Sequence, residues 1–225
     1  MRQFIFVILL FILPQTANAE FIVTSAIVEF TKDKPPQQDI EIISRSRDND
    51  YIVAELTEVI NPGAPDEIRR PVTDPSEGYL LVTPDRTILA GGSRKTIRFV
   101  LLKPLDDKEH IYRVAIKPVI KGVENNAKLG LKILLGYEIL VILRPYEMKP
   151  KFSISRNGNA LTLTNTGNTN IVLQNGKQCK SAAECTMPPT IRSYAGQTAT
   201  EQLPFNGPVD YSIWDGQAVV DRKID

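Results

Sequence analysis

The sequence contains few of the side chains on which most catalytic and metal sites depend. Among its 225 residues there is one histidine, His110, and there are two cysteines, Cys179 and Cys185. A tetrahedral zinc site draws on several such ligands, and a Ser-His-Asp or Cys-His site would have to use His110. The sequence therefore argues against both kinds of site, and we expect no enzyme activity, no cofactor and no metal.

Neither sign of charge predominates. The chain has 27 Lys and Arg residues against 26 Asp and Glu residues, which gives a formal net charge of +1. Proteins that bind nucleic acid or a membrane surface through a broad positive field carry a larger excess of basic residues. The near balance argues against both of those classes.

Long hydrophobic runs are also scarce, apart from one at the amino terminus. A basic residue precedes the apolar run from Phe4 to Leu13, and the small-residue sequence Ala17-Asn18-Ala19 follows it. This order is typical of a secretory signal peptide and predicts cleavage after Ala19. An uncleaved anchor is the alternative, although about ten apolar residues are too few to span a bilayer comfortably.

Export changes the interpretation of the cysteines. Cys179 and Cys185 are separated by five residues and would meet an oxidising environment outside the cytoplasm. The spacing differs from the Cys-x-x-Cys pattern of redox proteins. We therefore predict a structural disulfide, Cys179–Cys185, with a free or redox-active pair as the alternative.

Hydrophobic periodicity predicts an all-β protein. Short β-branched or alternating stretches dominate, and no segment keeps the helical i, i+3, i+4, i+7 pattern over three turns. The strands expected in the first part of the chain are 21–30, 39–44, 51–60, 79–83, 87–89, 94–101, 111–117 and 129–143. Seven or eight strands in about 125 residues favour an immunoglobulin-like sandwich.

The segment from Arg144 to Pro150 carries two prolines and predicts a semi-rigid elbow between two domains. Further strands are expected after it, at 152–156, 159–165, 170–174, 190–194, 198–203, 209–214 and 218–221. We therefore expect a signal peptide at 1–19, a first immunoglobulin-like domain at 20–145 and a second at 146–225. The second domain is small enough for one disulfide to contribute to its stability.

The predicted strand from Leu129 to Leu143 is longer than a sandwich needs. Every second residue in it is apolar, over a length of about 50 Å, whereas an ordinary strand spans about 20 Å. Part of this row should project beyond the core of its own domain, where an exposed apolar strand promotes aggregation. Either the strand bends between two sheets of its own domain, or the protein lends it to a partner by β-augmentation.

A set of motifs in a fixed order resembles the periplasmic pilus (fimbrial) chaperones, the PapD-like family of two immunoglobulin-like domains set in an L. The motifs are Tyr51-Ile52, Ile60-Asn61-Pro62-Gly63, Val82-Thr83-Pro84, Ile88 to Arg98, Ile111-Tyr112-Arg113-Val114, Leu143-Arg144-Pro145 and Leu161 to Asn168. With the signal peptide and the long strand, they cover nearly the whole mature chain. The Tyr-Arg-Val strand, the Thr-Asn-Thr-Gly-Asn run and the cysteine pair are most similar to the alternate-type chaperones.

The resemblance implies a function in the periplasm of a Gram-negative bacterium. Such a chaperone binds pilin subunits by donor-strand complementation, prevents their aggregation and delivers them to an outer-membrane usher. The donated row would be Leu131, Ile133 and Leu135, with Leu129 and Tyr137 as extensions. The remaining members of the row, Ile139, Val141 and Leu143, would pack in the core of their own domain. Self-association that masks this row in the free protein is a further hypothesis.

The resemblance fails at the site that binds the pilin's terminal carboxylate. The best-known branch uses a lysine on the donor strand and an arginine on the first strand, but here Leu140 takes the lysine position and strand 21–30 has no arginine. A carboxylate contact needs a cation, so Arg113 is the first candidate anchor, followed by Lys132 and Lys117. The alternative for Arg113 is an ordinary exposed cation of the sheet.

The resemblance also suggests that Arg98 and Arg144 form structural ion pairs, with Arg144 reaching across the elbow to Asp210 or Asp215. Such pairs position domains more than they stabilise them.

Two other functions fit the sequence less well. A secreted adhesin or structural pilus subunit should carry its donor segment at the amino terminus and lack a closing strand, whereas here the long strand is internal and precedes a complete second domain. A secreted hydrolase could use a carboxylate pair among Asp106, Asp107, Asp210 and Asp215. All four lie near predicted turns, where aspartate is expected in any case.

Overall fold

The computed structural model describes residues 21–119, 135–181 and 183–225. Its regular structure is almost entirely β-strand, with one short 3-10 helix, η1 (Pro75–Glu77). The expected signal peptide at 1–19 lies outside the described residues. Within the described part of the chain, no helix is long and apolar enough to cross a membrane.

Two sheets packed face to face form the first domain. One sheet has the strand order β1-β3-β8-β6, and the other has the order β2-β10-β9-β4-β5, with β7 beside β4. The strands of the first sheet are β1 (Phe21–Val23), β3 (Gln37–Ser44), β8 (Arg94–Leu101) and β6 (Leu80–Thr83). The strands of the second are β2 (Ile27–Phe30), β10 (Tyr137–Leu143), β9 (His110–Pro118), β4 (Asp50–Ile60), β5 (Ile68–Pro71) and β7 (Arg86–Leu89). This is an immunoglobulin-like sandwich, as the periodicity predicted.

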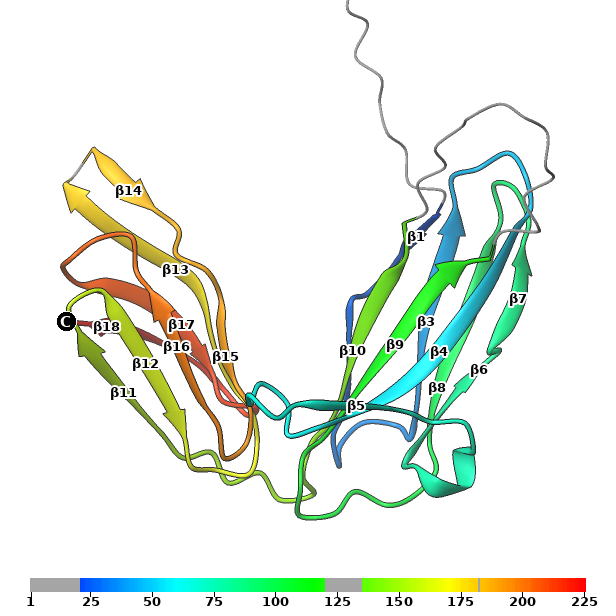
Figure 1. The fold of residues 1–225 in the computed structure, drawn as a ribbon, viewed down its shortest axis with the longest axis horizontal. Helices are drawn as coiled ribbons and strands as arrows, with labels where there is room; N and C mark the ends of the chain where they lie inside the picture. Colours follow the sequence, from blue (N-terminus) through cyan, green and yellow to red (C-terminus); the bar gives the residue numbers. More distant parts are fainter. Residues whose placement is uncertain (1–20, 120–134, 182) are drawn as a thin grey trace, which may run out of the picture.

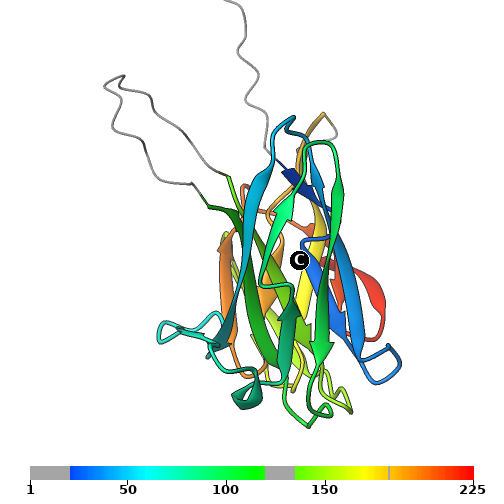
Figure 2. The same cartoon turned by 90° about the vertical axis from the view of Figure 1, so that its right-hand side faces the viewer.

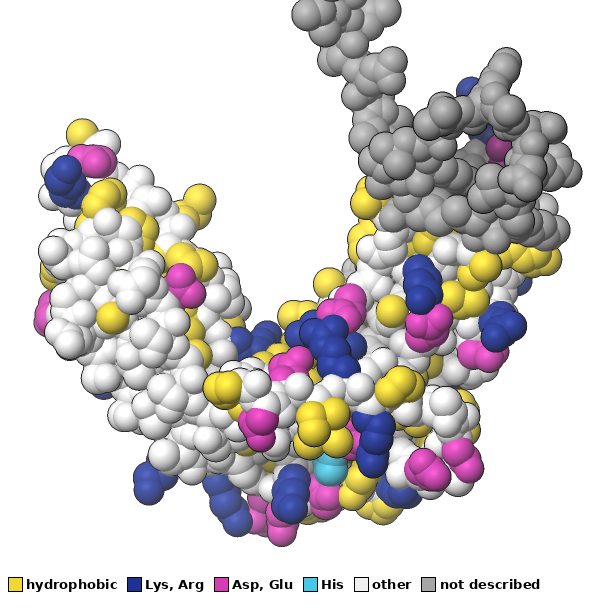
Figure 3. Space-filling view, in the orientation of Figure 1, with side chains coloured by type: hydrophobic (Ala, Val, Ile, Leu, Met, Phe, Trp, Pro, Cys, Tyr) yellow, Lys and Arg dark blue, Asp and Glu magenta, His cyan; other side chains and the backbone are white. Residues whose placement is uncertain are grey.

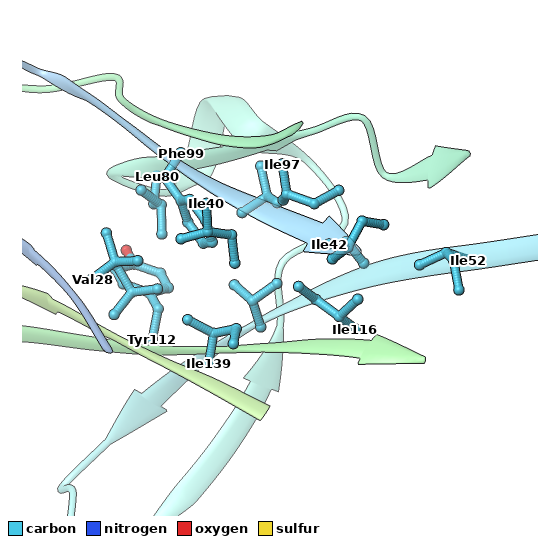
Figure 4. Packing of buried hydrophobic residues seen from close by; sticks show 14 of the residues in the cluster. Val28, Ile40, Ile42, Ile52, Leu80, Ile97, Phe99, Tyr112, Ile116 and Ile139 are labelled. Carbon is cyan, nitrogen blue, oxygen red and sulfur yellow. The ribbon is translucent and has the colours of Figure 1, made fainter. Parts of the chain in front are cut away.

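Alternate residues of both sheets point inward and form one apolar core. Figure 4 shows this packing, in which Ile40, Ile42, Ile97 and Phe99 of the first sheet lie opposite Ile52, Tyr112, Ile116 and Ile139 of the second. All eight side chains are at most 3% exposed. Burial of each aliphatic side chain of this size stabilises the fold by about 1.5–3 kcal/mol.

The first strand is not continuous, contrary to the expectation of a single strand over 21–30. It breaks after Val23, where Thr24 exchanges hydrogen bonds with Glu41, and the Ser25 hydroxyl donates to Ile27 O at 2.6 Å. These side-chain bonds stabilise a bend, because serine and threonine hydroxyls compete with the strand ladder. The chain therefore crosses from one sheet to the other, so that β1 pairs with β3 and β2 pairs in parallel with β10.

The second domain is a smaller sandwich. One sheet has the strand order β11-β12-β16, and the other has the order β14-β13-β17-β18, with β15 beside β13. Its strands are β11 (Phe152–Asn157), β12 (Ala160–Asn165), β13 (Ile171–Ser181), β14 (Glu184–Thr186), β15 (Ile191–Ser193), β16 (Thr198–Gln202), β17 (Val209–Trp214) and β18 (Val219–Ile224). Leu161, Leu163, Leu173, Tyr211 and Ile213 lie at the centre of its own apolar core.

The two domains are the arms of an open angle that join at one end (Figure 1). The chain passes from one arm to the other between β10 and β11, at the predicted elbow. In both Figure 1 and Figure 2 the strands run lengthwise along their arms, and the free ends of both arms lie on the same side of the joint. The space-filling view in Figure 3 shows an open cleft between the arms, and β10 lies on the side of the first arm that faces it in Figure 1.

Candidate functional site: the apolar strand and the cleft between the domains

The expected donated row lies mostly outside the described residues. Leu129, Leu131 and Ile133 belong to the part of the chain that the structure does not describe, whereas Leu135 is described and is 54% exposed. Tyr137 packs its ring against Phe21, with 5.3 Å between ring centroids, and its hydroxyl donates to Phe21 O. Among the described members of the row, Leu135 is open to a partner and Tyr137 packs within its own domain.

One edge of β10 is only partly paired, because its first residues have no partner strand there among the described residues. On one side β10 pairs with β9 from Tyr137 to Leu143, but on the other side β2 pairs only with Leu140 to Leu143. Within the described residues, no strand pairs with the remaining edge, from Tyr137 to Ile139. Unpaired backbone groups on an edge strand are a template for the strand of another chain.

The rest of β10 alternates between two buried environments. Ile139, Val141 and Leu143 are fully buried in the first-domain core, as expected from the period of the strand. Leu140 and Ile142 point the other way, into a separate apolar cluster where the two domains meet. This cluster comprises Val59, Ile111, Leu140, Ile142 and, from the second domain, Tyr194.

Leu140 is therefore part of the contact between the domains. It is 6% exposed, and it is the residue that the resemblance aligned with the lysine of the best-known branch. Leu140 and Tyr194 pack in one apolar cluster, so this position of β10 supplies no cation to the cleft. The sequence showed that position 140 is a leucine, but it did not predict this cluster, because Tyr194 is distant along the chain and follows a short strand.

Arg113 lies beside Leu140, its partner in the β9–β10 register. Its side chain is 27% exposed, and its Nη1 is 3.8 Å from Glu138 Oε2. Glu138 is bound more closely by Arg69, at 2.8 Å, and Arg69 also pairs with Glu67. Arg113 thus places a positive charge on the wall of the cleft, and its contact with the Glu138 carboxylate is long.

A second cation approaches the same region from the other domain. Burial raises the pKa of Tyr194, and the positive charges of Arg113 and Arg192 act on its hydroxyl in the opposite direction. Burial lowers the pKa of Arg192, whose guanidinium donates to Asn170 Oδ1. The sequence did not single out Arg192, because an isolated Arg in a strand carries no pattern.

The other two candidate anchors differ from Arg113. Lys117 is committed to an ion pair with Glu55 at 2.8 Å. Lys132 lies outside the described residues.

Arg144 holds the two domains together from a buried position. It is fully buried and pairs with Glu29 at 2.8 Å and with Glu109 at 3.3 Å. The same guanidinium donates to Thr169 Oγ1 and Asn170 O of the second domain. These partners replace the expected Asp210 and Asp215: Asp210 is exposed on β17, and Asp215 caps a turn by accepting from Gln217 N and Ala218 N.

Glu109 completes this junction. Its Oε2 accepts hydrogen bonds from the Asn170 backbone and side chain and from Thr169 Oγ1. Burial raises the pKa of Glu109, although Asn170, Arg144 and Thr169 act against the shift. The role of Glu109, directly before β9, was not predicted, because its partners Arg144, Thr169 and Asn170 are distant along the chain.

Arg98 forms an ion pair of a different kind, on the surface of the first domain. Its guanidinium donates two hydrogen bonds of 2.9 Å to the Asp39 carboxylate across the β3–β8 pair. These bonds lower the pKa of Asp39. Because both side chains are more than a third exposed, solvent screens much of this interaction.

The single histidine lies in a polar cluster near the elbow. Asp106 accepts from the Tyr79 hydroxyl at 2.7 Å and contacts His110 Nε2 at 3.0 Å, while the rings of Tyr79 and His110 stack at 4.2 Å. Burial acts to raise the pKa of Asp106, but the hydrogen bonds from Tyr79, His110 and Lys108 outweigh it and lower the pKa to about 2. Asp106 is thus bound by its neighbours in a structural cluster.

Two further features bear on the sequence predictions. Cys179 and Cys185 form the predicted disulfide, which joins facing residues of β13 and β14 in an exposed hairpin. Within the described residues, no group of three or more His, Cys, Asp or Glu side chains could hold a metal ion.

Fold and site together define a two-domain β-sandwich protein with an apolar strand at an open sheet edge. No protein-family model matches the chain. It is 31% identical to a CFA/I fimbrial subunit of Escherichia coli over 191 residues, which cover 81% of this chain and 78% of that protein. It is 25% identical over 134 residues to the probable fimbrial chaperone EcpE of Escherichia coli O157:H7, covering 57% of this chain and 54% of that protein.

Solved structures show the same fold. The crystal structure of the class 5 fimbriae chaperone CfaA matches with a TM-score of 0.59 and 21% identity, over 90% of this chain and 98% of that one. A complex of the Salmonella enterica SafA pilin with the SafB chaperone matches with a TM-score of 0.66 and 14% identity, over 93% of this chain and 97% of that one. The chain belongs to the family of the CFA/I fimbrial protein, and it shares its fold with these fimbrial chaperones.

Proposed function

We propose that the protein captures fimbrial subunits in the periplasm by lending them the strand around residues 129–135. A chaperone function in fimbrial assembly agrees with its family. The observation that supports the lent strand is the exposed side chain of Leu135 directly before an open edge of β10. A partner strand paired there gains main-chain hydrogen bonds, and alternate apolar side chains of the lent strand fill the gap in the partner's core.

Arg113 is proposed as the anchor for the terminal carboxylate of the fimbrial subunit. It lies on the cleft wall beside β10, and its contact with Glu138 is long, at 3.8 Å. A carboxylate at hydrogen-bonding distance would gain a charge-assisted contact while Glu138 keeps its pair with Arg69. Lys117 and Lys132 remain the weaker candidates.

Export and delivery complete the proposed function, and both follow from the resemblance. A signal peptide at 1–19 would export the chain, and domains at 20–145 and 146–225 would act as one unit. Delivery to an outer-membrane usher would follow capture. The chemistry is that of binding alone, so we propose no enzymatic step.

A structural pilus subunit is the alternative, since one relative is named a fimbrial subunit. That function would require the protein to accept a strand. In the described first domain, β10 instead pairs with β9 on one side and, from Leu140 to Leu143, with β2 on the other, and the two sheets enclose one apolar core. This arrangement favours a protein that donates a strand.

Co-expression with a fimbrial subunit tests the proposal. Ile133→Asp with Leu135→Asp should abolish co-purification of the subunit while the chaperone remains folded, because charges cannot enter an apolar core. Val220→Asp is the matched control, since Val220 is 58% exposed in the second domain. Unchanged capture by the double variant would show that the donor strand is assigned wrongly.

A further inference from the structure

The outer face of the β10 sheet carries apolar side chains at both ends and charged ones between them. Near the elbow, Val59, Ile111 and Ile142 lie in one cross-strand row and are covered by Tyr194. Charged residues occupy the middle of the face, including the Glu55–Lys117 and Glu138–Arg69 pairs. On this face, the apolar row near the elbow is thus buried by the second domain.

The opposite end of this face carries a second apolar row. Ile88, Tyr51 and Val119 lie side by side across β7, β4 and the end of β9, since Ile88 is the register partner of Tyr51 and Val119 N donates to Tyr51 O. They are 48%, 36% and 47% exposed. With Val53 and Arg86 they line a shallow groove of about 350 Å³. Figure 3 shows hydrophobic side chains gathered over β4 and β7 at this end.

We propose that this groove, the tip groove, is a second contact for the fimbrial subunit that β10 engages. The inference rests on the proposed function. Three exposed apolar neighbours in one row are unusual on the solvent face of a sheet, where polar residues alternate with the core, and such patches commonly mark interaction surfaces.

The position of the tip groove identifies its occupant. Leu135 and Gly136 enter β10 at the same end of the sheet, and Gly136 lies so close to Lys117 of β9 that a Cβ on it would be 3.1 Å from Lys117 Cβ. Val119 is two residues beyond Lys117, directly after the end of β9. The tip groove thus begins beside the start of the proposed donor strand. It extends over β9 and β4 to β7, and β7 lies about 15 Å from β10.

The partner's own architecture brings it over this face. A protein that takes in a strand is a sheet protein, and a stable sheet packs a second layer about 10 Å away. The inner face of the β10 sheet is filled by its own core, including Ile52 and Ile116. The partner's second layer therefore has the outer face available to it, and there the apolar row offers the contact.

Charge substitutions in the tip groove test the inference. Ile88→Asp and Val119→Asp should each weaken the complex with the fimbrial subunit by at least about tenfold, because a charge replaces a buried apolar contact. The dissociation constant is measured with purified chaperone and a denatured subunit diluted into it. Ile68→Asp is the matched control, since Ile68 is 56% exposed on β5 of the same sheet, and it should bind as the parent protein does.

The outcomes separate this inference from the proposed function. If Leu135→Asp abolishes binding but both groove variants bind as the parent does, the tip groove is not a subunit contact. If Leu135→Asp with Ile133→Asp leaves binding unchanged, the proposed function itself fails. If the groove variants alter only the sedimentation of the free chaperone, a second copy covers the tip groove and the inference is wrong. Ile88→Ser and Val119→Ser replace any aspartate variant whose circular dichroism spectrum changes, and they should show the same loss.

Discussion

Arg144 Nη1 lies 3.3 Å from Glu109 Oε2 in a junction where both side chains are at most 1% exposed. The same guanidinium pairs with Glu29 and donates to Thr169, so one cation contacts two carboxylates and joins both domains. Arg144→Ala would leave those carboxylates without their counter-charge. Removal of one partner from a buried pair costs about 3–5 kcal/mol, and we expect a loss of that size in the free energy of unfolding.

Arg98→Ala is the control for this prediction, because Arg98 also pairs with a carboxylate but lies on the surface. The loss in the free energy of unfolding, measured by chemical denaturation, should be much smaller for Arg98→Ala. Equal losses for the two variants would mean that burial does not determine the contribution of Arg144.

Gly63 fixes the contact between the Asn61–Gly63 turn and Tyr194. It has a φ of 75°, and a Cβ added to it would lie 3.1 Å from Tyr194 Cδ2. Gly63→Ala should therefore cost both backbone strain, about 1–2 kcal/mol, and a displacement of Tyr194. Gly92→Ala serves as the control, since Gly92 has a φ of 68° and open space around it. Thermal unfolding should show a larger drop in melting temperature for Gly63→Ala than for Gly92→Ala. Small-angle scattering should show a wider angle between the arms for Gly63→Ala alone.

The pKa of Asp106 makes part of the stability depend on pH. Its folded-state pKa of about 2 lies below the unfolded value of about 3.9, so the contribution is present above about pH 4 and is lost as the pH falls toward 2. In an NMR titration, Tyr79→Phe should raise this pKa, because it removes the 2.7 Å hydrogen bond. Tyr146→Phe should leave it unchanged, since Tyr146 reaches Asp106 through its backbone N–H. A pKa near 3.9 in the parent protein would contradict the prediction.

Arg113 should contribute to subunit binding through its charge. We expect Arg113→Ala to weaken binding of the fimbrial subunit by about tenfold, with the difference shrinking at high salt, because the lost contact is charge-assisted. Arg113→Lys should restore part of the affinity. Arg70→Ala, which removes an exposed cation of the edge strand β5 that pairs with Glu58 of β4, should have no effect. Equal binding by the parent protein and Arg113→Ala would exclude Arg113 as the anchor.

Much of the fold could be predicted because alternation is a local signal. Strands 94–101 and 209–214 have the bounds that periodicity predicted. β5 was missed, since Ile68–Pro71 is exposed throughout, carries two arginines and ends in proline. β14 was missed because it is three residues long and largely polar, and β13 runs seven residues beyond its predicted end as the partner of that strand.

The site was predictable where it follows a pattern and not where it depends on distant contacts. The apolar period of β10 correctly separated Ile139, Val141 and Leu143 as core residues. The predicted partners of Arg144, Asp210 and Asp215, were wrong. The crossing of the chain at residues 24–26 brings Glu29 to Arg144, and the junction of the domains brings Glu109 to it. Tyr194 and Arg192 carried no sequence signal, since their roles arise from the angle between the arms.

The crossing of the first strand between sheets sets a limit on how far a foreign strand can pair with β10. Leu140 N already donates to Ala26 O, and β2 continues the pairing from there. A guest strand can therefore hydrogen-bond along β10 as far as Ile139 and no farther. The amino-terminal strand acts as an end stop, so a guest whose chain terminus abuts it is held in one register and each of its side chains faces a fixed pocket.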